Sequence, residues 1–265
     1  MIVKNVVKQL QVEAMKIEIH QNSKAAGAAA AQAAASALRD LASSRASVAV
    51  IFATGASQLD TLDALTGMQG LPWNQVSGFH MDEYVGIAED HPASFRRYLR
   101  ERLTRKVQMK EFFEIDGNAA DPEQEAEKYA GRLRFADPQL CLLGIGENGH
   151  LAFNDPAVAN FTDPRDAKVV QLDSLCRKQQ AAEGWFASAA EVPASAITLT
   201  IPTLLRVPKL IASVPGARKR SIVRRALEEA ISTQCPATIL RTHPNVTLYL
   251  DLESAAELDE VLVSR

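Results

Sequence analysis

Cysteine is scarce in this 265-residue chain, where only Cys141, Cys176 and Cys235 occur, far apart. Their spacing fits neither a disulfide framework nor a metal site, which favours a reducing compartment. Long apolar runs are also missing, since no stretch approaches the roughly 18 residues of a membrane span. The first 20 residues lack the apolar core and cleavage site of a signal peptide. We therefore expect a soluble, cytoplasmic protein without bound metal.

An excess of charge of one sign is absent as well. The chain has 29 basic and 32 acidic residues, a formal net charge of −3. This balance gives neither the basic footprint of a nucleic-acid-binding protein nor a polybasic membrane patch, so we expect no partner of either kind. What is present is ordinary, with 47% hydrophobic and 23% charged residues, as in globular proteins of a size that can bury a core unaided.

Apolar strand-like segments alternate with helical ones along the chain. Strands are expected at residues 15–20, 47–53, 75–81, 139–145, 168–172, 196–201, 209–214 and 246–250. Helices are expected at residues 23–41 (with Asn22 or Ser23 as N-cap), 57–65, 92–103, 122–133, 216–230 and 254–262. Strands separated by helices of ten or more residues favour a largely parallel sheet. With no repeat or linker in view, we predict a single α/β domain over residues 1–265, a Rossmann-like open sheet flanked by helices.

Ligands of open parallel sheets bind on the loops beyond the carboxyl ends of the strands. Three such loops carry glycine and polar residues, at 53–57, 81–86 and 144–156. In the first, A-T-G-A-S, small residues let the backbone approach an anion, while Thr54, Ser57 and helix N-terminal amides supply donors. A capped strand–helix turn would use the same residues, so phosphate binding remains one of two interpretations.

The second loop, M-D-E-Y-V-G, places two acids, Asp82 and Glu83, directly after an apolar strand. A carboxylate in this place can face a pocket and act as a base, with its pKa adjusted by partial burial. A helix N-cap or an ion pair within the loop would explain the same two acids. The motif alone leaves both interpretations open.

The third loop, G-I-G-E-N-G-H-L-A-F-N-D-P, formally contains the G-x-G-x-x-G dinucleotide fingerprint. That fingerprint requires a helix to begin within the loop, and the closing N-D-P would interrupt such a helix. We favour a glycine-rich loop that exposes His150 between Asn148 and Asp155. Histidine transfers protons near neutral pH, and a carboxylate can fix its tautomer.

Together the loops resemble those of the glucosamine-6-phosphate deaminase family, within the group that includes 6-phosphogluconolactonases. The family pattern is T-G-G-T/S after a strand, then D-E-Y-V-G with H-P-x-S-[FY], then G-[IV]-G-x-[DN]-G-H-[IL]-[AG]-F-N-E-P. The segments V-P-G-A-R-K-R (214–220) and P-A-T-I-L-R-T-H-P (236–244) are similar to two later family elements, so the likeness covers roughly residues 20 to 255. The lactonase branch usually has D-E-R and D-G-H-x-A-S-L-F-P instead, so the resemblance favours the deaminase side.

The resemblance implies conversion of glucosamine-6-phosphate and water into fructose-6-phosphate and ammonia, without a metal or organic cofactor. His150, oriented by Asn148 and Asp155, would assist opening of the sugar ring. Asp82 would move a proton from C2 to C1, and Glu83 would support its loop. Binding of the substrate phosphate is implied for Thr54, Gly55, Ala56, Ser57 and Lys219.

The chain departs from the family at several of these positions. Asn148 stands where the family has Asp or Asn, so it can orient a partner but cannot relay a proton. Asp155 replaces the usual Glu with a shorter arm, and Ala56 replaces the second glycine of the phosphate loop. Gly184 stands where the family has a phosphate-binding arginine, and Arg177 is the candidate to replace it.

Two other functions remain open. The first is a lactonase that uses His150 as a base on water. The second is a sugar-phosphate sensor, for which a helix-turn-helix segment and a basic face would be expected; about 14 residues precede the first expected strand. The sequence leaves open the choice between glucosamine and galactosamine phosphate, any allosteric control, and assembly into a homo-oligomer.

Overall fold

The computed structural model describes residues 6–172, 174–182 and 184–258. They contain an eight-stranded sheet of order β1-β2-β11-β10-β7-β3-β4-β6, in which every neighbouring pair is parallel except β1 with β2. The strands are β1 (Val6–Val12), β2 (Met15–His20), β3 (Val48–Phe52), β4 (Val76–His80), β6 (Glu111–Phe113), β7 (Leu140–Leu143), β10 (Lys209–Ser213) and β11 (Val246–Asp251). The predicted α/β class with a mostly parallel sheet is confirmed.

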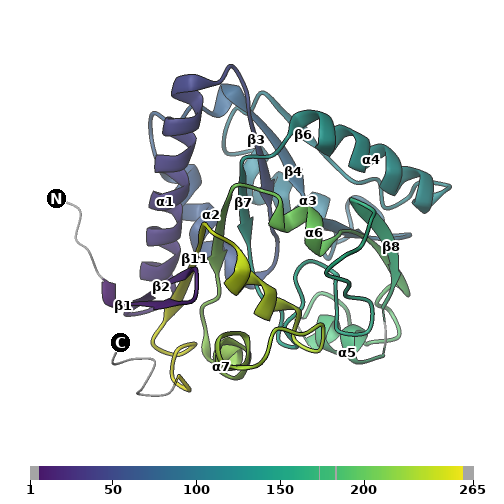
Figure 1. Ribbon diagram of the computed structural model, residues 1–265. Coiled ribbons are helices and arrows are strands. Elements are labelled where there is room, and N and C mark those ends of the chain that lie inside the picture. The colour runs from purple at the N-terminus through teal and green to yellow at the C-terminus, as the bar shows by residue number, and fades with distance from the viewer. Residues whose placement is uncertain (1–5, 173, 183, 259–265) are drawn as a thin grey trace.

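Helices cover both faces of this sheet, with α1 along one side and α4 and α6 on the other (Figure 1). They are α1 (Ser23–Ser44), α2 (Leu59–Gly67), α3 (Phe95–Leu99), α4 (Pro122–Ala136), α5 (Ser174–Ala182), α6 (Ile201–Leu205) and α7 (Arg220–Glu228). Further helical segments of the 3-10 or π type are η1 (Ala56–Gln58), η2 (Trp73–Gln75), η3 (Arg100–Thr104), η4 (Ala217–Lys219) and η5 (Pro236–Thr242). None of the helices in the described ranges combines the length and apolar character needed to cross a bilayer.

The helix expected at residues 254–262 is not seen in the part of it that the structure describes. Residues 254–258 adopt turns, and residues 259–262 lie outside the described part of the chain. Asp251 and Ser254 bond to each other through side chain and backbone, as at a helix start. Only the amide of Ala255 then donates four residues back, to Asp251, whereas Leu258 closes a tighter turn on Ala255. Among residues 254–258, the hydrogen bonds therefore close a single turn of the α-helical kind.

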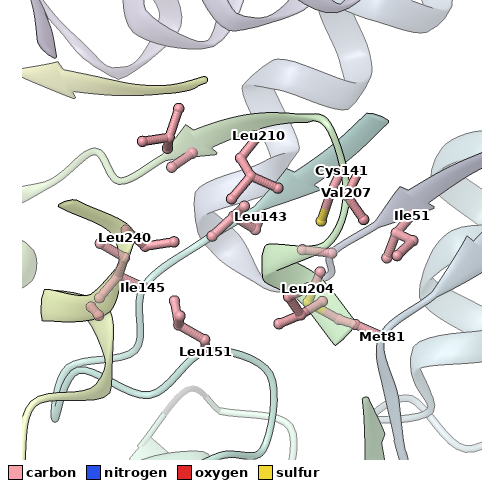
Figure 2. Close-up of a cluster of buried hydrophobic side chains, with 14 of the residues drawn as sticks. Ile51, Met81, Cys141, Leu143, Ile145, Leu151, Leu204, Val207, Leu210 and Leu240 are labelled. Carbon is pink, nitrogen blue, oxygen red and sulfur yellow. The ribbon is translucent and has the colours of Figure 1, made fainter. Parts of the chain in front are cut away.

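Alternate residues of the central strands point into two different hydrophobic layers. Phe52 of β3 packs in the layer under α1 and α2, whereas its neighbour Ile51 packs in the opposite layer. Figure 2 shows this second layer, in which Ile51, Cys141 and Leu143 gather with Leu204 of α6. The central strands are continuous apolar runs because both of their faces are buried.

Helix α1 can lie close to its neighbours because small residues form its buried face. Asn22 caps the helix, its Oδ1 accepting a hydrogen bond from the amide of Ala25 at 2.9 Å. A Cβ added at Gly27 would stand 2.5 Å from Cβ of Asp60, at the start of α2. Ser23, in the first turn of α1, donates a hydrogen bond to Asp60. The other buried residues of α1 are Ala26, Ala30, Ala31, Ala34, Ala35, Ala37 and Leu38.

A second, antiparallel sheet of three strands stands beside the main one, in the order β5-β9-β8. Its strands are β5 (Asp82–Tyr84), β9 (Ser195–Leu199) and β8 (Ala167–Gln171). The sequence predicts the last two as members of one largely parallel sheet, which is wrong, and it does not predict β5. A three-residue segment that begins with two acids has little intrinsic strand preference, so long-range pairing with β9 decides its conformation.

Strands β1 and β6 are also missed by the sequence pattern. Both lie at edges of the eight-stranded sheet, β1 as the antiparallel partner of β2 and β6 beside β4. β1 alternates half-buried and exposed residues, and β6 has no fully buried residue. Such edge strands lack the continuous apolar run by which the central strands are recognised.

Candidate active site

A cavity of about 340 Å³ opens at the carboxyl ends of β3, β4, β7 and β10. β3 and β7 are neighbours, and from them the strand order runs in opposite directions, through β4 on one side and β10 on the other. Such a switch point is where open α/β sheets bind ligands, and the volume suits a small molecule. All three sequence-predicted loops contribute to its lining, at residues 53–57, 81–82, 144–147, 150 and 152–153.

The loop of residues 53–57 forms one end of the cavity and is shaped by its backbone. Gly55 has φ +89°, a conformation that glycine adopts without strain. η1 and α2 follow at once, so Thr54 and Ser57 stand at a helix N-terminus, which favours an anion. Behind the loop, the buried Gln58 donates from Nε2 to the carbonyls of Leu143 at 3.1 Å and Ser213 at 3.5 Å. This one side chain ties the ends of β7 and β10 to the loop.

The segment of residues 215–219, which follows β10, completes this end of the cavity. Its Gly216 has φ +97° and donates its N–H to both carboxylate oxygens of Asp251, at 3.0 and 3.1 Å. Lys219 lines the cavity, and its Nζ donates to the carbonyl of Ile145 at 2.7 Å. The adjacent Arg218 is exposed and also lines the cavity. Two cations therefore stand at the same end as the A-T-G-A-S loop.

The glycines of the third loop make room for side chains rather than for a dinucleotide. A Cβ at Gly144 would stand 2.9 Å from Oγ of Ser57, and one at Gly146 would stand 2.2 Å from the ring of His150. Gly149 has φ +92°. No helix begins between residues 144 and 156, where the chain forms turns and an isolated bridge. The dinucleotide interpretation is therefore ruled out for this loop.

His150 is held by two side chains of its own loop. Its Nδ1 lies 3.1 Å from Oδ1 of Asp155, and Asn148 donates to the same oxygen at 2.6 Å. Oδ1 of Asn148 in turn accepts the backbone N–H of His150 at 3.0 Å. Burial alone would raise the pKa of Asp155, but the hydrogen bond and charge of His150, with the bond from Asn148, lower it to about 2. The shorter arm of Asp155 thus reaches the imidazole as a carboxylate, and the other ring nitrogen, Nε2, is not used in this pairing.

Asp82 lies where the chain passes from β4 to β5, and it lines the cavity with only 6% of its surface exposed. Burial raises its pKa well above the usual range, and the charges of Glu83 and Asp155 raise it further. Behind it, Nε2 of the buried His80 accepts the N–H of Ile115 at 2.8 Å. Burial lowers the pKa of His80 to about 3, so this ring is neutral. A buried carboxylate with a raised pKa is a strong base for its type.

Glu83 is turned away from the cavity into the protein. Its carboxylate accepts hydrogen bonds from Oγ of Ser94 at 2.8 Å and from the backbone amides of Phe95 and Arg96, at 3.1 and 3.0 Å. These donors are the N-cap and first two residues of α3, at the end of the H-P-A-S-F segment and just after it. The two motifs are therefore joined physically, and Glu83 fixes the loop that carries Asp82.

Arg177 is not part of the cavity lining. Its guanidinium donates at 2.9 Å to each of the carbonyls of Val192 and Ala190, and so ties α5 to the segment before β9. The expectation that Arg177 replaces the missing phosphate-binding arginine is therefore corrected. Gly184, at the place of that arginine, is exposed with φ +88°.

Three polar side chains that line the cavity from outside the three loops are not predicted as site residues: Ser23, Gln180 and Arg218. Ser23 and Gln180 come from helices that no motif marks. Arg218 stands beside the predicted Lys219, and the second positive charge of G-A-R-K-R is the signal that would have found it. Within the described ranges, no cluster of three or more His, Cys, Asp or Glu side chains is placed to hold a metal ion.

Comparisons with known proteins find similar sequences and similar structures. A model of the family of glucosamine-6-phosphate isomerases and 6-phosphogluconolactonases matches residues 21–249. A glucosamine-6-phosphate deaminase from an Exiguobacterium species is 32% identical over 86% of this chain and 87% of that protein. One from Exiguobacterium sibiricum is 35% identical over 78% of this chain and 80% of that protein.

Two solved structures share the arrangement of the elements. A structure of a monomeric glucosamine-6-phosphate deaminase superimposes with a TM-score of 0.83 at 29% identity, covering 91% of this chain and 98% of its own. A 6-phosphogluconolactonase from Thermotoga maritima superimposes with a TM-score of 0.73 at 18% identity, covering 89% and 99%. The second likeness shows the fold alone.

Proposed function

Since the chain belongs to the family of glucosamine-6-phosphate isomerases and 6-phosphogluconolactonases, we propose that it is an enzyme that converts glucosamine-6-phosphate and water into fructose-6-phosphate and ammonia. One observation carries the proposal. A buried base, Asp82, and an oriented histidine, His150, line one cavity whose other end holds Lys219 and Arg218. A sugar with a phosphate at one end and a reacting amine at the other matches this distribution of charge.

The phosphate binds at the cationic end in this proposal. The turn at Gly55 and the hydroxyls of Thr54 and Ser57 surround it from one side, at the helix N-terminus. Lys219 supplies a point charge suited to a phosphate dianion, and Arg218 takes the place for which Arg177 was the candidate. Two positive charges offset a dianion, which supports a monoester phosphate as the anchoring group.

His150 opens the sugar ring. Because Asp155 holds Nδ1, the imidazole can use Nε2 toward the substrate. It gives a proton to the ring oxygen and receives one from the C1 hydroxyl, so the bond between C1 and the ring oxygen breaks and an aldehyde forms. Asp155 remains a carboxylate through this exchange and keeps the ring in place.

Asp82 then moves a proton along the open chain. It takes the proton from C2 while the aldehyde oxygen gains one from the ammonium group, which gives an enolamine. It then delivers its proton to C1, which leaves a protonated imine at C2. Water adds to the imine carbon, and ammonia leaves. A positively charged amine beside Asp82 offsets the repulsion from Glu83 and Asp155, and so favours the carboxylate form that acts as a base.

The same charges disfavour lactone hydrolysis. Attack of water on a lactone carbonyl builds negative charge on its oxygen, and that charge requires hydrogen-bond donors. The reacting end instead places Asp82 within range of the negative charge of Asp155, and a lactone brings no cation to offset the repulsion that raises the pKa of Asp82. This end of the cavity suits a developing cation better than a developing oxyanion.

The test is product formation by the purified protein. We expect ammonia and fructose-6-phosphate in equal amounts from glucosamine-6-phosphate, with galactosamine-6-phosphate and 6-phosphogluconolactone as parallel substrates. Hydrolysis of the lactone without release of ammonia from either amino sugar would contradict the proposal. We further propose that residues 1–265 act as one domain in the cytoplasm; light scattering decides between a monomer and a homo-oligomer.

A further inference from the structure

Gln180 is a cavity residue for which the proposed mechanism has no task. It lies on α5, within residues 173–186, where the chain departs from the family pattern. It lines the cavity together with Asp82 and Phe153 and is only 6% exposed. A nearly buried amide in the wall of a polar pocket calls for hydrogen-bond partners on both of its ends.

One end of this amide is held by Tyr84. The tyrosine hydroxyl donates to Oε1 of Gln180 at 2.6 Å. Tyr84 is itself 1% exposed, with ring centroids 5.1 Å from both Phe95 and Phe153 and 5.5 Å from Phe186, which it meets edge-on. Tyr84 stands two residues after Asp82 on β5, so the strand that carries the base also sets the orientation of the amide.

The other end, Nε2, has two N–H groups to donate. Among the described residues, Nε2 donates no hydrogen bond. Some polar atoms in the described residues are fully buried and have no hydrogen-bond partner, and Nε2 of Gln180 is not one of them. Nε2 therefore reaches open space, and the open space that Gln180 lines is the cavity.

We propose that Gln180 Nε2 donates a hydrogen bond to the hydroxyl oxygen on C4 of the sugar, the carbon at which glucosamine and galactosamine differ, and thereby selects between hexosamine 6-phosphates. This inference rests on the proposed function, which places C1 and C2 beside Asp82 and the phosphate beside Lys219. The hydroxyls between them then pass the wall that Gln180 forms. A fixed donor rejects the epimer whose hydroxyl points elsewhere, because the donor is then left desolvated and unpaired.

The first test compares the two epimers. In Gln180→Ala and in Gln180→Glu, which keeps the shape but loses the donor, the ratio of kcat/KM for glucosamine-6-phosphate and galactosamine-6-phosphate should move toward one by about 10–100-fold. Tyr84→Phe removes the bond that orients the amide but keeps the amide itself, so its ratio should move in the same direction by a smaller factor. Lys178→Ala, at an exposed position of the same helix, should leave the ratio unchanged. An unchanged ratio in both Gln180 variants would overturn the proposal, as would a wild type that does not discriminate.

The second test separates this inference from the proposed function. Calorimetry with inorganic phosphate and with glucosamine-6-phosphate is carried out in an Asp82→Asn background, in which turnover is blocked. Adding Gln180→Ala should weaken the sugar phosphate about tenfold or more and leave inorganic phosphate unchanged. Equal weakening of both ligands would indicate a merely structural role, and no weakening would remove Gln180 from the site. If the wild type releases no ammonia, the proposed function fails, while this binding difference still decides the role of Gln180.

Discussion

The two ends of the cavity are built in different ways. The end that holds Lys219 follows three parallel strands and is shaped by backbone, with Gly55 and Gly216 at positive φ and Gln58 joining the strand ends. The end that holds Asp82 borders the antiparallel sheet and is shaped by side chains that are buried, aromatic or titratable.

The comparison shows that the end with Lys219 depends on the topology of the sheet, whereas the end with Asp82 depends on individual side chains. A parallel sheet brings its loop backbones to one edge whatever their side chains are, so the first end needs only small residues and cations there. At the second end, the protonation of Asp82 and the orientation of His150 depend on particular neighbours. Substitutions there should change the chemistry, whereas substitutions at the first end should change affinity.

The largest effect is expected for Asp82→Asn. The amide keeps the shape but cannot accept a proton, so kcat should fall by about 10²–10⁴-fold. Affinity for inorganic phosphate, measured by calorimetry, should stay within error of the wild type because the other end is untouched. Retention of more than about a tenth of the wild-type rate would show that another group is the base.

Gly146→Ala should be nearly as harmful. The added Cβ would stand 2.2 Å from the ring of His150, so the imidazole must leave its bond to Asp155. We expect a loss of kcat of about 100-fold, the scale of a displaced acid–base group. Gly131→Ala is the matched control, since its Cβ would meet only a side-chain atom of Arg134 at 3.9 Å. A normal rate in Gly146→Ala would mean that the position of His150 does not matter.

Asp155→Asn should have a smaller effect with a recognisable pH signature. Loss of the carboxylate weakens the orientation of His150, and we expect kcat to fall by about 10–100-fold. It also removes one of the charges that raise the pKa of Asp82, so the acid limb of kcat/KM should move to lower pH.

Two further measurements sharpen this prediction. An open-chain analogue of the substrate should bind Asp155→Asn as it binds the wild type, because ring opening is bypassed. Asp155→Glu restores the charge on a longer arm. If Asn is neutral and Glu improves the rate, Asp155 is not the group that orients His150.

At the cationic end, Lys219→Ala should act on affinity. KM should rise by about tenfold with kcat nearly unchanged, since a phosphate contact made equally in ground and transition states contributes only to binding. Arg218→Ala should raise KM by less, because Arg218 is exposed and solvent screens its charge. If Lys219→Ala changed kcat alone, the two ends would not divide into one for affinity and one for chemistry.

The smallest effect concerns stability. Burial raises the pKa of Asp82 in the folded protein, so its contribution to stability is full below the unfolded pKa and is lost as pH rises toward the folded one. Asparagine does not ionise, so Asp82→Asn removes the loss of unfolding free energy that the buried carboxyl causes as pH rises. We expect a Tm higher by about a few °C at neutral pH, as for a change of about 1 kcal/mol. The difference should vanish near about pH 4, the unfolded pKa of Asp, and a lower Tm at neutral pH would contradict the assignment.

The same contrast explains how much the sequence could predict. The loops at 53–57, 81–83 and 144–155 are contiguous motifs after recognisable strands, so the approach of Asp155 to His150 is a local matter within six residues. Gln180 reaches the cavity only because α5 packs against the strand of Tyr84. The partners of Arg177 are backbone carbonyls 13 and 15 residues away, which no residue pattern indicates.

Helix α1 has a consequence for how this sequence can diverge. Its buried face holds six alanines and Gly27, and alanine orders no side-chain torsion when it is buried. The close approach to α2 at Gly27 depends on that smallness, so nearly every exchange to a larger residue would push the helix outward and carry Ser23 away from the cavity. In a library randomised at these positions and selected for folded protein, we expect almost only Ala, Gly and Ser. The exposed face of the same helix should accept many residue types.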